Sequence, residues 1–238
     1  GIGFEVAKRL GQDGYTVILN GIDDEAGAER LKELTSQGIT AEYLGFDVTK
    51  EDQVTSNITQ IGEKYGRIDV LVNNAGGLGG RSRFEEMTTD FYRNVMALNL
   101  DSVFFASRAA IPFLKKGELP SIINYTSNAG WTAGGPGAGI YGTSKAGVHA
   151  ITRALAKDLA EYGIRANAVS PGTIDTPFHA QIKATKPEVF ASWANNIMLG
   201  RLGQPEDVAG VVSFLASKDA SFITAETIQI GGGQALGI

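Results

Sequence analysis

The feature of this chain that most limits its fold is the alternation of short β-branched or apolar runs with longer segments of helical periodicity. The short runs have the length of buried strands, and the longer segments have the length of helices that cover a sheet. This order is typical of a parallel sheet with helices on both faces. The expected strands are 16–20, 41–46, 68–73, 121–126, 166–170 and 227–230. The expected helices are 4–12, 24–37, 51–65, 89–116, 141–162 and 205–217, the fourth being long enough for two.

The pattern runs without a repeat, a low-complexity tract or a linker, so we expect one doubly wound, Rossmann-like α/β domain over residues 1–238. Residues 173–200 break the regular alternation. We expect short helices there, in a lid that lies over a site.

The first residues, Gly1-Ile2-Gly3, run directly into an amphipathic helical segment, and the chain does not begin with Met. In a doubly wound sheet the first strand is central, and its glycine-rich turn precedes such a helix. We therefore expect the first strand and half of the turn to lie upstream of this sequence. Without that strand, the strands near Thr16 and Ile68 would flank an empty position with unpaired backbone groups.

Composition narrows the chemistry. The chain has no Cys and only two His, which excludes disulfides, thiol nucleophiles and cysteine-ligated metal centres, and leaves little room for a metal site. Redox chemistry would need an organic cofactor. A net charge of -5 without a basic run argues against nucleic acid as a partner. No apolar run reaches membrane-spanning length and no signal pattern opens the chain, so we expect a cytoplasmic protein without a membrane partner.

Three segments predict contacts with a dinucleotide. Gly1-Ile2-Gly3 would let the helix amides approach a pyrophosphate, and Asn20-Gly21 ends the next strand, about 20 residues later, where such a fold meets the adenosine ribose. Asp47-Val48 closes a strand, and its carboxylate could accept from the adenine amino group or cap the helix near Lys50.

A second group of residues predicts the reacting end of the site. Asn73-Asn74-Ala75-Gly76 ends a strand with small residues, as needed where backbone lies against a flat cofactor. Tyr141 and Lys145 are four residues apart and share one helix face, although a surface pair could have the same spacing. Ser127 follows a strand end, and Asn99 lies inside the long preceding helix.

These motifs resemble those of the short-chain dehydrogenase/reductase family, and the resemblance spans the whole chain. Residues 223–233 resemble the last strand and turn of that family, with Ala225 where many members have Gly. The motifs occur in the family order: Gly1-Ile2-Gly3, Asp47-Val48, Asn73-Asn74-Ala75-Gly76, Asn99, Ser127, Tyr141 with Lys145, and Pro171-Gly172-Thr173-Ile174-Asp175-Thr176.

The resemblance implies a hydride transfer between a nicotinamide cofactor and a carbonyl or alcohol, with Tyr141 as the general acid in reduction. The Lys145 ammonium would stabilise the phenolate, and Ser127 would donate to the substrate oxygen as negative charge develops on it. Asn99 would hold a water that links Lys145 to solvent, unless its amide only bonds a backbone carbonyl. The cofactor carboxamide would be held at Pro171, Gly172, Ile174 and Thr176.

Within the family, residues 76–81, 131–139 and 176–180 look most similar to reductases of 4-deoxy-L-erythro-5-hexoseulose uronate, the product of alginate breakdown. That substrate carries a carboxylate, which Arg81 could grip bidentately unless it pairs with Glu85. Trp131 would form an apolar wall, or belong to the core, and His179 would bond a sugar hydroxyl. We expect His149 to serve packing.

Two other functions stay open. A 3-oxoacyl-thioester reductase would share every catalytic residue, and a non-catalytic dinucleotide sensor would share the fold. The family resemblance also implies a homodimer or homotetramer built on helices 89–116 and 141–162. Ile22, where members that favour NADPH often have Arg, and the acidic residues 23–25 favour NADH. Gly21 complicates this, because NADH-preferring members often have Asp there, and the missing turn could supply a phosphate partner.

Overall fold

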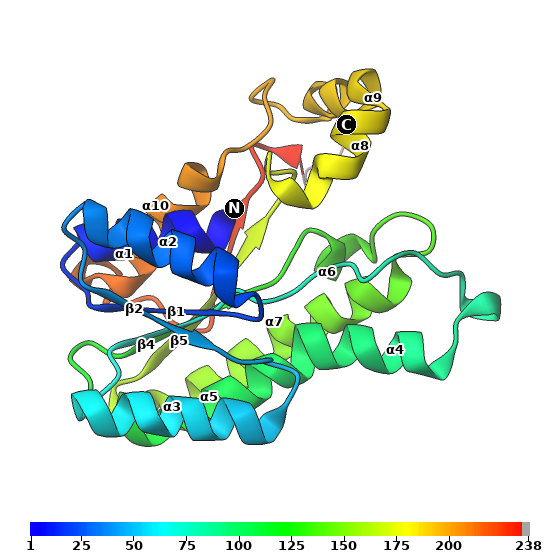
Figure 1. Cartoon of the computed structure of the whole chain (residues 1–238). Coiled ribbons are helices and arrows are strands. Elements are labelled where there is room, and N and C mark those ends of the chain that lie inside the picture. Colours follow the sequence, from blue (N-terminus) through cyan, green and yellow to red (C-terminus); the bar gives the residue numbers. More distant parts are fainter. Residues whose placement is uncertain (235–238) are drawn as a thin grey trace.

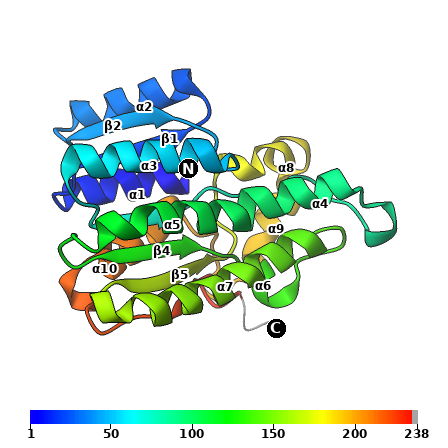
Figure 2. The same cartoon turned by 90° about the horizontal axis from the view of Figure 1, so that it is seen from below.

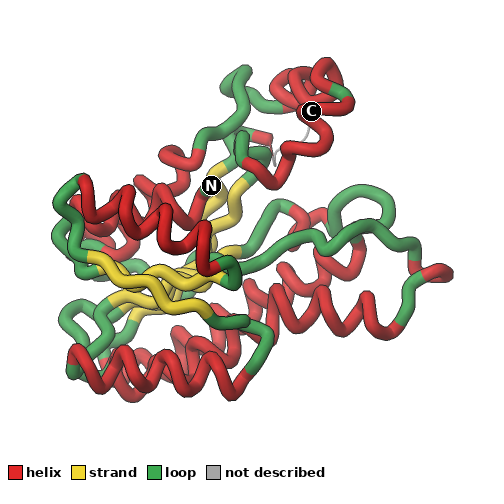
Figure 3. The backbone as a smooth tube through the Cα atoms, in the orientation of Figure 1, coloured by secondary structure: helices red, strands yellow, loops and turns green. Residues whose placement is uncertain are grey.

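The computed structural model describes residues 1–234 and contains six parallel strands. They form a two-stranded sheet, β1-β2, and a four-stranded sheet, β3-β4-β5-β6, as Figure 3 shows in yellow. The strand order and the parallel pairing confirm the predicted α/β, Rossmann-like class. The strands are β1 Val17–Gly21, β2 Ala41–Gly45, β3 Val70–Asn73, β4 Ser121–Tyr125, β5 Arg165–Pro171 and β6 Thr227–Ile230.

Helices cover both faces of these strands (Figures 1 and 2). One face carries α1 Ile2–Gln12, α2 Asp24–Ser36 and α10 Pro205–Ala216, and the other carries α3 Glu51–Tyr65, α5 Ser102–Leu114 and α7 Gly139–Leu159. Each layer has its own apolar core, one around Val6, Ile123 and Val212, the other around Val54, Ile122 and Ala166. Because Ile122 and Ile123 alternate in β4, this one strand contributes to both cores.

A cavity of about 1560 Å³ runs between the two sheets, and its lining includes residues at both the amino and the carboxyl ends of their strands. β1 and β3 both line it, and within residues 1–234 each of them pairs with a strand on one side only. The site described below occupies the end of the cavity nearest α7.

Several elements differ from the sequence-based expectation. The segment expected as one long helix, or two, is α4 Thr89–Met96 joined to α5 through a π-helical turn, Ala97–Asp101. A short helix that we did not expect, α6 Ala129–Thr132, follows β4. β3 begins two residues late because the amide of Ile68 donates to Phe113 O at the end of α5 instead of joining the ladder.

The lid residues form short helices, as predicted, and rise above the sheet in Figure 1. They contain α8 Ala180–Thr185 and α9 Pro187–Ser192. None of the helices described between residues 1 and 234 is both long and apolar enough to span a bilayer.

Contact between α3 and α5 leads to a stability prediction. A Cβ on Gly62 of α3 would come 2.2 Å from Cγ of Phe113, whereas a Cβ on Gly210 of α10 would meet nothing within 4 Å. We expect Gly62→Ala to lower the free energy of unfolding by about 1–3 kcal/mol through overpacking. Gly210→Ala, the matched control, should raise it by about 0.5–1 kcal/mol. Urea unfolding measures both, and equal effects would contradict the assigned packing.

Candidate active site

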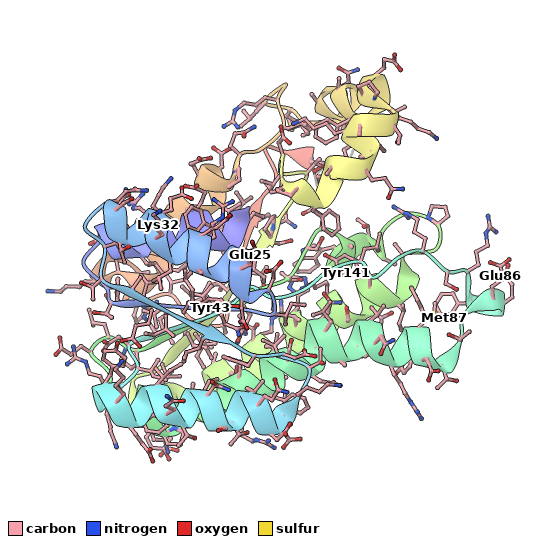
Figure 4. The ribbon with its side chains drawn as sticks, viewed as in Figure 1. Glu25, Lys32, Tyr43, Glu86, Met87 and Tyr141 are labelled. Atoms are coloured by element: carbon pink, nitrogen blue, oxygen red, sulfur yellow. The ribbon has the colours of Figure 1, made fainter. Side chains whose placement is uncertain are left out.

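Three side chains that the sequence analysis singled out meet at the cavity wall. Tyr141 and Lys145 lie one turn apart on α7, and Ser127 lies in the loop after β4. The Lys145 Nζ atom is 5.8 Å from the centre of the Tyr141 ring. The Ser127 Oγ atom accepts from the Ala129 amide at 3.2 Å, and the serine lies close enough to Tyr141 to lower the pKa of the phenol. Figure 4 shows Tyr141 on the α7 side of the cavity, with Tyr43 and Glu25 on the α2 side.

Burial sets the protonation of this group. Lys145 is 3% exposed, and its Nζ donates to Tyr125 O at 2.9 Å. Desolvation lowers the pKa of Lys145 to about 8, so the ammonium form prevails below that pH. Burial raises the pKa of Tyr141, and the nearby Ser127 partly opposes that rise. At neutral pH Tyr141 therefore holds its proton and is chemically able to act as a general acid.

Asn99 lies in the π-helical turn and is fully buried. Its Nδ2 donates to Gly77 O at 2.8 Å and to Val95 O at 2.9 Å, and its Oδ1 accepts from the Gly77 amide at 2.9 Å. The backbone-bonded alternative is thus the one observed, while the water relay stays a prediction. A Cβ on Gly76 would lie 2.8 Å from both Asn99 Oδ1 and Lys145 Nζ, so Asn99 holds the loop after β3 directly over the lysine.

Part of the cavity wall carries groups that suit a dinucleotide. The wall includes the uncapped N-terminus of α1, whose amides suit a pyrophosphate. A Cβ on Gly3 would come 2.6 Å from Asn74 Nδ2, so only glycine leaves the backbone open there. Apart from Asp47, all residues expected to bind the cofactor line this cavity: Gly1, Ile2, Gly3, Asn20, Gly21, Val48, Asn74, Ala75, Gly76, Tyr141, Lys145, Pro171, Gly172, Ile174 and Thr176.

Asn20 and Asp47 serve local structure at the far end. The Asn20 Nδ2 atom donates to Leu44 O and Phe46 O at 3.2 and 2.9 Å, which ties β1 to the end of β2. The Asp47 carboxylate accepts from the amide and hydroxyl of Thr49 at 2.8 and 2.7 Å, and these bonds lower its pKa. Asp47 thus stabilises the turn before α3, a role similar to the helix cap that we considered for it. A contact with adenine stays a prediction.

Sequence reasoning missed two residues at this end. The Tyr43 hydroxyl donates to Asp23 O at 3.1 Å and to Asp24 Oδ1 at 3.2 Å, so it fixes the acidic loop after β1. Arg30 of α2 lines the cavity and pairs with Glu33 at 2.6 Å. Arg30 could have been found from its spacing, because it lies three residues after Gly27 and therefore on the same face of the helix.

The three expected substrate residues have different positions. Arg81 lines the cavity, and its Nη1 donates to Pro136 O at 2.8 Å; the ion pairs found within residues 1–234 do not include one with Glu85. His179 also lines it, packed on Phe178 with ring centres 5.0 Å apart. Trp131 is not in the lining, and its ring packs on His149 with ring centres 4.2 Å apart. It is half exposed, so the core position is wrong, while the substrate wall stays a prediction.

Comparison with known proteins agrees with this arrangement. A family model described as enoyl-(acyl carrier protein) reductase matches residues 1–235. A diacetyl reductase, (S)-acetoin forming, of Staphylococcus aureus is 38% identical over 98% of this chain and 93% of its own length. A 3-oxoacyl-(acyl-carrier-protein) reductase of Thermotoga maritima is also 38% identical, again over 98% of this chain and 93% of the relative.

Two solved structures have the same fold over nearly the whole chain. A gluconate 5-dehydrogenase from Burkholderia cenocepacia, in complex with NADP and tartrate, is 29% identical with a TM-score of 0.91 and covers 100% of this chain and 92% of its own. The NADH-dependent reductase A1-R', responsible for alginate metabolism, is 35% identical with a TM-score of 0.88 and covers 98% of this chain and 92% of its own.

A substitution at Tyr141 tests the site. We expect Tyr141→Phe to lower kcat for a carbonyl substrate by about 100-fold or more, because only the proton donor is removed. Cofactor affinity, measured by fluorescence titration, should stay the same. Tyr162→Phe, at a half-exposed tyrosine in the 3-10 turn that follows α7, is the control and should keep full turnover. Near-normal turnover of Tyr141→Phe would remove the assigned role.

Proposed function

Because the chain belongs to the short-chain dehydrogenase/reductase family and is an NAD(P)-dependent oxidoreductase, we propose that its substrate is a keto-sugar acid. The carbonyl compound we favour is a keto-uronate such as 4-deoxy-L-erythro-5-hexoseulose uronate. The observation that carries the proposal is the Arg81 guanidinium in the wall of the cavity that also holds Tyr141 and Ser127. The 35% identity with a reductase of alginate metabolism supports the same substrate class.

The reaction divides the work between cofactor and protein. A reduced nicotinamide, when bound, supplies the hydride that reaches the carbonyl carbon. Tyr141 donates its proton to the carbonyl oxygen, and the Ser127 hydroxyl donates a hydrogen bond to the same oxygen as charge develops on it. Lys145 keeps a positive charge beside the phenol below pH 8 and favours the phenolate that remains. Proton return from solvent, through Lys145 and a water at Asn99, completes the cycle.

Arg81 has capacity left for a carboxylate. A guanidinium has five N–H donors, and the hydrogen bond to Pro136 O uses one of them. Gly135 and Gly137, which lie against Arg81, come shortly before the start of α7 and Tyr141. A substrate whose carbonyl meets Tyr141 can therefore extend its carboxylate toward Arg81, with His179 on the lid facing the hydroxyls.

A 3-oxoacyl thioester is the second candidate substrate, and the 38% identity with an acyl-carrier-protein reductase supports it. Such a substrate needs the same Ser127, Tyr141 and Lys145. Assays with keto-uronates, neutral keto sugars and 3-oxoacyl thioesters, followed by loss of reduced-nicotinamide absorbance, separate the two. A clear kcat/KM preference for the thioester would overturn our choice.

We also propose a cytoplasmic homodimer or homotetramer built on α4, α5 and α7. Exposed aromatic rings lie along the first two helices, including Tyr92 and Phe104. Ala109 of α5 is small and only partly buried, which allows a second helix to approach closely. Light scattering at micromolar concentration tests this assembly.

Arg81 gives a test of the substrate class. We expect Arg81→Ala to raise KM for a keto-uronate by about 10-fold or more, since a charge-assisted hydrogen bond contributes about 1.5–3 kcal/mol. KM for a neutral keto sugar should change far less. Arg83→Ala, outside the cavity lining, is the control and should affect neither. Equal changes with both substrates would leave Arg81 as a structural residue.

The loop after β1 gives a test of cofactor preference. Ile22 and Asp23 line the cavity, and Tyr43 fixes Asp24 beside them, so the local field is negative. We expect higher kcat/KM with NADH than with NADPH, because a 2′-phosphate would meet these carboxylates. Ile22→Arg should shift the ratio toward NADPH, and Ile22→Gln, of similar length without charge, should not. A wild-type preference of about tenfold for NADPH, roughly 1.4 kcal/mol, would contradict this.

A further inference from the structure

His149 is a buried polar residue that the proposed chemistry does not use. It lies one turn after Lys145 on α7, is 5% exposed and does not line the cavity. Its Nε2 lies 3.0 Å from Thr126 Oγ1 in the segment just before Ser127, and its Nδ1 lies 3.1 Å from Thr227 Oγ1 of β6. One imidazole therefore connects α7, the end of β4 and β6 beneath the catalytic group.

The direction of these hydrogen bonds follows from Thr126. Its hydroxyl donates to Lys145 O at 2.9 Å, so its one proton is used. Nε2 of His149 must then donate to Thr126, and Nδ1 must accept from the hydroxyl of Thr227. Burial lowers the pKa of His149, and the charge of Arg153 lowers it further, so the neutral ring is favoured. His149 thus holds one defined tautomer.

The same ring supports α6, the short helix that follows Ser127. Trp131 stacks on His149 with ring centres 4.2 Å apart. A Cβ on Gly130 would come 2.8 Å from His149 Nε2, so α6 lies directly against the imidazole. A Cβ on Gly142 of α7 would come 2.6 Å from Cα of Ala133, which shows how closely the segment packs on α7 beside Tyr141.

We propose that His149 is a positioning residue that fixes Ser127 against Tyr141 by holding Thr126 on one side of the serine and α6 on the other. Ser127 lies between Thr126 and Ala129, and it reaches Tyr141 from a different element, so their alignment depends on how this segment docks on α7. An error of about 1 Å in such an alignment can cost about 100-fold in rate. The inference rests on the proposed catalytic role of Ser127 and Tyr141.

Two variants of His149 separate its contacts. The amide nitrogen of Gln lies close to the position of Nε2, so His149→Gln can still donate to Thr126. Asn is shorter and reaches only toward Thr227, so His149→Asn loses the Thr126 bond. Thr152→Val is the matched control, because it removes another buried hydroxyl of α7, bonded to Asn124 and Val148 rather than to the catalytic segment.

The first readout is the pKa of Tyr141, measured by NMR of isotope-labelled tyrosine with Tyr141→Phe to assign the signal. Since the nearby Ser127 lowers this pKa, we expect it to rise in His149→Asn and to stay near wild type in His149→Gln and Thr152→Val. The second readout is kcat with any carbonyl substrate that the wild type reduces. We expect kcat to fall about 10-fold in His149→Asn and to stay within about threefold of wild type in His149→Gln. Cofactor affinity should be unchanged in both variants.

An unchanged Tyr141 pKa and kcat in folded His149→Asn would overturn the inference, as would equal losses in the Gln and Asn variants without a pKa change. If His149→Asn fails to fold, Trp131→Leu takes its place, since Trp131 is half exposed. If Trp131 acts through the position of Ser127, the pKa of Tyr141 should be higher in this variant. A higher KM without a change in this pKa would indicate a direct contact with substrate and would contradict the inference. Because the pKa needs no turnover, a wild type inactive on all carbonyls would refute the proposed function separately.

Discussion

The packing of α7 against β4 is the contact on which the site depends. Two buried hydrogen bonds hold α7 to the end of β4 beside the site: Lys145 Nζ donates to Tyr125 O, and Thr126 Oγ1 donates to Lys145 O, each at 2.9 Å. Leaving one such group without its partner costs about 1–3 kcal/mol in a protein interior. These bonds fix the height and rotation of the helix relative to the strand, and with them the meeting of Ser127, Tyr141 and Lys145.

Burial of this contact also determines the acid–base chemistry. Desolvation favours the neutral form of every group, so it raises the pKa of Tyr141 and lowers that of Lys145. The two pKa values therefore move apart, with that of Lys145 at about 8 and that of Tyr141 above its ordinary value, so the lysine loses its proton before the phenol does as the pH rises. A tyrosine that keeps its proton at neutral pH suits reduction, whereas oxidation of an alcohol needs the phenolate and is favoured at higher pH.

Sequence patterns predicted the parts of the molecule that depend on periodicity. All six strands and the six main helices occur where expected, since a strand buried on two faces and a helix buried on one leave distinct apolar spacings. The short helix α6 left no such spacing, because its four residues complete barely more than one turn. Trp131 could not be placed for the same reason: its stacking on His149 joins residues 18 positions apart, and only tertiary packing determines it.

The polar ends of the cavity were predicted unevenly. Ser127, Tyr141 and Lys145 stand at strand and helix ends that the topology brings together, so their meeting could be foreseen. Tyr43 could not, because it reaches the far end of the cavity from the middle of β2, where the sequence marks no boundary, whereas the helical spacing of Arg30 from Gly27 was a signal that went unused. Asp47 shows the converse, since a carboxylate at a strand end bonds its own turn as readily as a ligand.

The π-helical turn at Ala97–Asp101 is a single wide turn between α4 and α5, and it holds one residue more than a turn of regular α-helix. Each residue of an α-helix advances the rotation by about 100°. Loss of a single residue from this turn would therefore restore regular winding with α4 and α5 still in phase, but the residues kept within the turn would be rotated from their present positions by up to about that angle. Asn99 would swing away from Gly77, and the loop over Lys145 would lose its anchor. This turn thus tolerates a substitution more readily than a change in length. An insertion or deletion here would change the function even where every side chain of the site is kept.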